Sequence, residues 1–131
     1  MEIIVSQAKG RVPVTIMRLK GDLDYLSADN FDAQARKLVE NGARDILVDL
    51  SGVAFMSSVG IRSLNKLYDL VHADKTEEKK AVYKGVLSGT YKAPHLKLLN
   101  PNQRVFESIK LIGLDMYIDI FKDEPEAIAA F

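Results

Sequence analysis

The chain has 131 residues, 47% of them hydrophobic and 27% charged, and its 18 basic and 18 acidic residues cancel to a formal net charge of zero. This composition is typical of one globular domain, and a neutral chain has no overall field to attract nucleic acid or an anionic membrane surface. Because cysteine is absent, disulfides, thiol catalysis and thiolate metal sites are excluded.

The N-terminal residues lack the basic segment and long apolar core of a signal peptide. No apolar run approaches the roughly 20 residues that a membrane-spanning helix needs. We therefore expect a single domain over residues 1–131, located in the cytoplasm.

The first forty residues predict a β-hairpin and a helix. Glu2–Gln7 and Val12–Leu19 are rich in strand-forming residues, and Pro13 belongs at a strand start or on an edge. Ser27 is a candidate N-cap for a helix that ends at Asn41-Gly42. The apolar face of this helix is formed by Phe31, Ala35, Leu38 and Val39.

A buried strand and a second helix follow. Ile46–Leu50 is an apolar run that carries one acid, Asp49, and apolar residues recur at helical spacing from Ser57-Ser58 to Val71. The serine pair therefore lies at the N-terminal end of a helix, where free backbone N–H groups favour negative charge. A serine at this place can cap the helix or carry a phosphate.

The segment Asp74–Ala93 does not fit the alternation of strands and helices. It either extends the preceding helix past His72 or leaves the core as an insertion. Its role is either that of a surface insertion without function or that of a partner-selecting surface. The remaining predicted elements are a strand at His95–Leu99, a helix, a strand within Met116–Phe121 and a short helix within Asp123–Ala130. The first of these helices is predicted to be capped at Asn100-Pro101 and to end at Gly113. Its apolar face is formed by Val105, Ile109 and Ile112.

Few residue patterns point to catalysis. His72 and His95 lie far apart in the sequence, without acidic companions at ligand spacing, and His72 is predicted to face solvent. The sequence contains no phosphate-binding glycine loop, no esterase pentapeptide and no evident base for Ser58.

The acidic residues that attract attention have structural interpretations. Asp22 and Asp24 are predicted to form a turn, and Asp49 is predicted to accept hydrogen bonds from nearby backbone N–H groups. We therefore predict a protein that is not an enzyme and that holds neither a metal nor a cofactor.

The segment from Asp49 to Ile61, DLSGVAFMSSVGI, resembles the signature of the anti-sigma factor antagonist (STAS domain) family, an apolar strand followed by D-L-S-x-V-x-F-M-D-S-x-G-L. Lys20–Asp24 is similar to the family's turn before the first helix, and Leu98–Asp115 is similar to its later strand-to-helix unit. The resemblance covers nearly the full chain apart from residues 74–93. It implies a single α/β domain with a mixed β-sheet and about four helices packed against it.

The resemblance assigns roles to individual positions. Ser58 matches the phosphate acceptor, Gly60 the glycine at the helix start and Asp49 the acid of the strand. Ser57 replaces the acid that precedes the acceptor, which leaves Ser57 as the alternative acceptor, and Val59 replaces a small polar residue of many members. The partner-binding residues expected from the resemblance are Asp22, Asp24, Ser57, Ser58, Gly60 and Arg62.

The function implied by the resemblance is binding. An anti-sigma factor antagonist binds an anti-sigma factor that is also a serine-protein kinase, releases a sigma factor, and is switched off by phosphorylation. One alternative is an unphosphorylated STAS scaffold subunit of a stress-signalling or lipid-transport complex, and a less favoured one is a small hydrolase. Self-association is left open.

Overall fold

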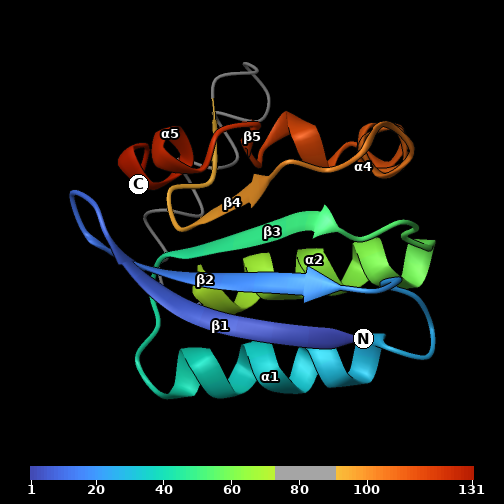
Figure 1. Cartoon of the computed structure of the whole chain (residues 1–131), viewed down its shortest axis with the longest axis horizontal. Helices are drawn as coiled ribbons and strands as arrows, with labels where there is room; N and C mark the ends of the chain where they lie inside the picture. Colours follow the sequence, from blue (N-terminus) through green and yellow to red (C-terminus); the bar gives the residue numbers. More distant parts are fainter. Residues whose placement is uncertain (73–90) are drawn as a thin grey trace.

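The computed structural model describes residues 1–72 and 91–131. Within these ranges five strands form one mixed sheet in the order β1-β2-β3-β4-β5, and the predicted α/β architecture with four helices is confirmed (Figure 1). The strands are β1 (Glu2–Lys9), β2 (Pro13–Lys20), β3 (Ile46–Gly52), β4 (Leu96–Leu99) and β5 (Ile120–Phe121). The helices are α1 (Ala28–Glu40), α2 (Ser58–Val71), α4 (Gln103–Ile112) and α5 (Glu124–Ala129), with a 3-10 turn η1 (Leu114–Met116).

The sheet begins with the predicted hairpin and continues with parallel strands. β1 pairs antiparallel with β2, and Pro13 opens β2, where the missing N–H disturbs the ladder least. β2, β3, β4 and β5 then run parallel to one another. The loops that follow β2 and β3 therefore lie together at one end of the sheet.

The side chains of β3 alternate between two cores. Ile46, Val48 and Leu50 belong to the larger core, which is shared with α1, α2 and α4. Leu47 belongs to a smaller core on the opposite face, which is covered by Ala127 of α5. Figure 1 shows α1 and α2 side by side along the first face.

Both long helices form as the sequence predicts. α1 buries Phe31 and Ala35, with Leu38 and Val39 partly buried beside them, and Gly42 after its end has a φ of +103°. In α2 the predicted apolar face is buried and comprises Ile61, Leu64, Leu67 and Val71. An amphipathic period and residue types typical of helix ends were sufficient signals for these two elements.

The start and the apolar face of α4 differ from the prediction. The helix is capped by Asn102, whose Oδ1 accepts a hydrogen bond from the N–H of Val105 at 2.7 Å, and not by Asn100-Pro101. Asn100 has a φ of +51°, and its N–H donates to the Phe121 carbonyl oxygen at 2.7 Å, which holds it against β5.

The end of α4 is only partly as predicted. Gly113 ends the helix in the left-handed conformation, with a φ of +91°. Ile112 is 53% exposed, although the periodicity placed it on the buried face. The chain turns at Gly113, and the next residue, Leu114, occupies the buried position.

The predicted strand within Met116–Phe121 is reduced to its last two residues. Met116 belongs to η1, and the N–H groups of Tyr117 and Ile118 both donate to the carbonyl oxygen of Leu114, so this part of the chain is a turn. The short helix at the end of the chain is confirmed as α5, capped by the Asp123 side chain at 3.0 Å from the N–H of Glu126.

The predicted helical extension or hairpin within Asp74–Ala93 lies almost entirely outside the described residues, which resume at position 91. Tyr91 is joined to Tyr68 by a hydroxyl–hydroxyl hydrogen bond of 3.0 Å, and Ala93 is buried. None of the helices in the described ranges has both the length and the apolar character to cross a membrane.

Candidate functional site

The two serines at the start of α2 have different environments. Ser57 is the N-cap residue, and its Oγ accepts a hydrogen bond from the N–H of Gly60 at 3.3 Å. Ser58 is the first residue of the helix, and its side chain is exposed, whereas Ser57 is half-buried. Within residues 1–72 and 91–131 the Ser58 hydroxyl makes no hydrogen bond to the protein.

The loop after β2 is bound to the loop that leads into α2. The N–H of Gly21 donates to the Gly52 carbonyl at 3.0 Å, and the N–H of Leu23 donates to the Phe55 carbonyl at 3.1 Å. In return, the N–H of Ser57 donates to the Leu23 carbonyl at 3.0 Å. These hydrogen bonds place the predicted residues of the first loop next to the serine pair.

Gly60, one of the predicted partner-binding residues, has a packing role in the structure. The residue is buried, and a Cβ atom added to it would overlap the carbonyl oxygen of Leu23. The absence of a side chain at position 60 therefore lets the first turn of α2 approach the backbone of the loop after β2. On this geometry a side chain at position 60 should impair folding, whatever its effect on partner binding.

The first loop contains the two acids of the predicted surface. Asp24 forms the predicted turn, because its Oδ1 accepts hydrogen bonds from the N–H groups of Leu26 at 3.0 Å and Ser27 at 3.3 Å. Ser27 occupies the N-cap position of α1, but its hydroxyl donates to the Asp22 carbonyl at 2.7 Å instead of capping the helix. The Asp22 side chain is exposed.

Arg62 follows Ser58 by one helical turn and lies on the same side of α2. Its side chain is exposed, and within the described ranges it forms no ion pair. Both residues border a cleft of about 310 Å³ between α2 and the end of α4. The cleft is lined by Ser58, Ile61, Arg62, Asn65, Ile112, Leu114 and Tyr117.

One wall of this cleft is fixed by a tyrosine. The Tyr117 hydroxyl donates to Asn65 Oδ1 at 2.6 Å, which ties η1 to α2. Burial raises the pKa of Tyr117, so the hydroxyl stays protonated and keeps donating this hydrogen bond.

Exposed apolar side chains occur on the segments that adjoin the serines and the cleft, and sequence reasoning did not assign them to the site. Tyr25 and Leu26, in the loop bound to Ser57, are 79% and 87% exposed. Ile112, which lines the cleft, is exposed as well, and so are Leu111 and Met116 next to residues of the lining. Exposed apolar groups that gather around a polar centre indicate a protein-binding surface.

Asp49 does not belong to this surface. It points to the face of the sheet that α5 covers, where its Oδ2 accepts a hydrogen bond from Arg18 at 2.8 Å and its Oδ1 accepts one from the N–H of Ser51 at 3.0 Å. Arg18 also pairs with Glu124 of α5 at 2.6 Å, and this contact, with the Asp49 contact, raises the pKa of Arg18. The prediction that Asp49 accepts backbone hydrogen bonds is therefore confirmed.

The histidines differ most from their prediction. His72 is buried at the end of α2, with its Nδ1 2.8 Å from the Tyr68 carbonyl oxygen, so it does not face solvent. Its ring centroid lies 5.4 Å from that of His95, whose Nδ1 is 2.7 Å from Asp45 Oδ1. Among the described residues, no group of three or more His, Cys, Asp or Glu side chains is arranged to hold a metal ion.

The fold is shared with several solved structures. An anti-sigma factor antagonist from Mycobacterium paratuberculosis is 19% identical, with 98% of this chain and 92% of that chain covered and a TM-score of 0.75. SpoIIAA from Bacillus in its phosphorylated form is 20% identical, with 97% and 96% covered and a TM-score of 0.62.

The same fold also occurs within a much larger protein. The murine Solute Carrier 26 family member A9 anion transporter is 17% identical, with 88% of this chain but 17% of that chain covered and a TM-score of 0.62. At these identities the likeness establishes the fold. A comparison with curated proteins found no match in sequence.

The sequence itself carries a family match over the first part of the chain. The STAS domain matches residues 5–77, which include most of the hairpin, α1, the loop after β2 and the serine pair at the start of α2. This match spans more than half of the chain, and the protein therefore belongs to the STAS domain family.

Proposed function

We propose that this protein is an anti-sigma factor antagonist whose binding is controlled by phosphorylation of Ser58. The observation that carries the proposal is the free, exposed hydroxyl of Ser58 at the first residue of α2, beside a serine whose own oxygen is engaged as the cap. The same reasoning favours Ser58 over Ser57 as the acceptor, because a phosphate on Ser57 would disturb the hydrogen bond to Gly60.

The physical effect of the phosphate supports a switch. A phosphate adds about −1.5 to −2 charges and three acceptor oxygens. The N-terminal end of α2 favours this charge within the protein, and Arg62 is close enough along the helix to contribute. The fold is then retained, while an acidic partner surface that contacts Ser58 is repelled and an apolar one would have to desolvate the phosphate.

The partner we propose is an anti-sigma factor that is also a serine-protein kinase. Such a kinase must contact the hydroxyl that it phosphorylates, and Tyr25, Leu26 and Ile112 provide exposed apolar area on both sides of it. Asp22 and Arg62 would form the polar rim of this contact. The protein acts in this proposal by binding and release, without catalysis of its own.

A scaffold role is the second candidate. It is favoured by the exposed side chains of Leu111 and Met116, which could bind other subunits without any phosphorylation. It is also favoured by Ser57, which stands in place of the family's acid. A scaffold subunit would remain unmodified and would copurify with other subunits.

Mass spectrometry of the protein purified from its native cells tests the proposal. We expect phosphate on the peptide that contains Ser58, and recovery of a serine-protein kinase with the unphosphorylated form only. Phosphate on Ser57 alone would refute the assignment of the acceptor. A protein that is never phosphorylated and stays in a stable complex would support the scaffold instead.

A further inference from the structure

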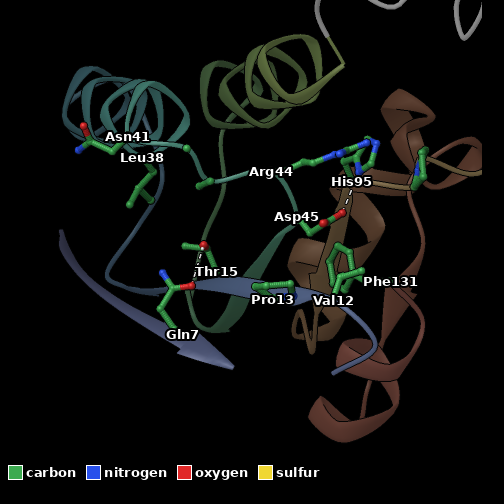
Figure 2. Close-up of a pocket in the computed structure, with 13 residues that line it drawn as sticks. Gln7, Val12, Pro13, Thr15, Leu38, Asn41, Arg44, Asp45, His95 and Phe131 are labelled. Atoms are coloured by element: carbon green, nitrogen blue, oxygen red, sulfur yellow. Dashed lines mark hydrogen bonds and ion pairs between the residues drawn. The ribbon is translucent and has the colours of Figure 1, made fainter. Parts of the chain in front are cut away.

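A second hollow lies at the end of the sheet opposite Ser58. It is a groove of about 710 Å³, and the segments that border it precede β3, open β2 and precede β4 (Figure 2). Its apolar walls are formed by Val12, Pro13, Leu38, Pro94 and Phe131. The volume lies in the range of about 300–1,000 Å³ that is usual for small-molecule sites.

The polar side of the groove is held in place by hydrogen bonds between strands. Asp45 and His95, which meet at 2.7 Å, are both largely buried. The backbone fixes the same two residues, because the N–H of Thr15 donates to the Asp45 carbonyl at 2.9 Å and the N–H of Ile46 donates to the His95 carbonyl at 3.0 Å. The groove is therefore preformed by the ends of three adjacent strands.

Arg44 gives the groove its charge. Its side chain is exposed, and Figure 2 shows it extending along the rim toward His95. In the ranges 1–72 and 91–131 no carboxylate forms an ion pair with Arg44, and Asp45, the nearest acid in the lining, already faces His95. A guanidinium that has no acidic partner in the described ranges, at the edge of an apolar groove, is suited to an anionic group that accepts two hydrogen bonds.

We propose that this groove binds a small organic acid, with its aromatic or aliphatic body between Leu38 and Phe131 and its single anionic group on Arg44. Thr15 and Gln7, which are hydrogen-bonded to each other at 3.2 Å, line the groove as its neutral polar part. Because Ser58 lies at the other end of the sheet, this site is separate from the proposed partner surface and does not depend on it.

The test uses 8-anilinonaphthalene-1-sulfonate, an aromatic probe with one anionic group, and its neutral analogue N-phenyl-1-naphthylamine. We expect saturable binding of the sulfonate with one site per chain, measured by the fluorescence of the probe. Arg44→Gln should weaken this binding by about tenfold or more, since a charge-assisted hydrogen-bonded pair is lost. Arg44→Lys, which keeps the charge, should weaken it less.

Two controls make the result specific. Arg36→Gln removes another exposed arginine, on α1, that does not line the groove, and it should leave binding unchanged. The neutral probe should bind wild type and Arg44→Gln equally. Backbone amide shifts on titration should concentrate at Thr15, Gly42 and Ala43.

Three results would overturn the proposal. They are the absence of saturable binding, binding that is insensitive to Arg44→Gln, and shifts that concentrate around the exposed side chains of Leu111 and Met116. Thermal melts of each variant verify that the folded protein is compared throughout.

Discussion

The carbonyl oxygen of Leu23 accepts a hydrogen bond from the N–H of Ser57 at 3.0 Å. The same oxygen is the atom that a side chain at position 60 would overlap first. One backbone group therefore both joins the two loops of the site and dictates a glycine in the first turn of α2. The geometry of the serine pair depends on how closely this turn approaches the loop after β2.

Gly60→Ala should consequently destabilise the protein. Overpacking of a close contact typically lowers the free energy of unfolding by about 1–3 kcal/mol, and here the obstacle is backbone that cannot change rotamer. Gly60→Leu should prevent folding. Denaturant titrations measure both, with Ser58→Ala as the control in the same turn. A Gly60→Ala protein as stable as wild type would contradict this prediction, because it would show that the loop after β2 can move to make room for a methyl group without loss of stability.

The cap provides a second prediction, which separates the two serines. Ser57→Ala should lower the free energy of unfolding by about 0.5–2 kcal/mol, because the N–H of Gly60 loses its acceptor. Ser58→Ala should change it by less than about 0.5 kcal/mol, because this exposed hydroxyl makes no hydrogen bond in the described ranges. Equal losses for the two variants would contradict the assignment of Ser57 as the cap.

The proposed switch predicts opposite effects on stability and binding. Ser58→Asp should keep or slightly raise the stability, since a carboxylate at a helix N-terminus gains about 0.3–1 kcal/mol. The same variant should bind the partner much more weakly, because charge is introduced at the centre of an apolar contact surface. Calorimetric binding titrations and thermal melts measure the two effects.

Ser58→Ala is the matched control for this experiment, because it removes the hydroxyl without adding charge. It should bind the partner as wild type does and should not respond to the kinase and ATP. If Ser58→Asp binds with unchanged affinity, the contact surface does not include Ser58, even though aspartate reproduces only part of the charge of a phosphate.

The sequence predicted those parts of the fold whose signals are local. α1 and α2 have a clear amphipathic period and residue types typical of helix ends, so their ends were predicted within one or two residues. At α4 two asparagines compete for the cap, and Asn100 is taken up by its backbone hydrogen bond to β5, which no local pattern reports. The predicted strand at Met116 was wrong for the same reason. The alternation of side chains does not reveal that the Leu114 carbonyl accepts two backbone hydrogen bonds, which make this segment a turn.

The site was predictable only where neighbours in sequence are neighbours in space. The serine pair follows from the junction between β3 and α2, and Asp24 follows from its turn. That Leu23 touches Gly60, or that Asp45 meets His95 across fifty residues, depends on strand pairing and was not visible. The exposed apolar residues were missed because exposure depends on which helices cover them.

A buried lysine allows a prediction about pH. Lys97 of β4 is almost inaccessible, with its Nζ 3.7 Å from Asp119 and 5.2 Å from the centre of the Phe131 ring. Burial lowers the pKa of Lys97 from its ordinary value of 10.5, and the attraction of Asp119 offsets only part of this. The charged form is therefore destabilised by folding at neutral pH.

Lys97→Met, of similar length and without charge, should be at least as stable as wild type at pH 7. As pH rises from the lowered pKa toward 10.5, the unfolded wild type binds more protons at Lys97 than the folded one, so wild-type stability rises relative to the variant. The difference in free energy of unfolding between variant and wild type should thus shift toward wild type as pH rises from the lowered pKa of Lys97 toward 10.5. Lys122→Met, which removes an exposed lysine, should show no such trend. A difference that stays constant, or that shifts toward the variant, would mean that Lys97 is charged at no cost and that its contacts with Asp119 and Phe131 fully compensate its burial.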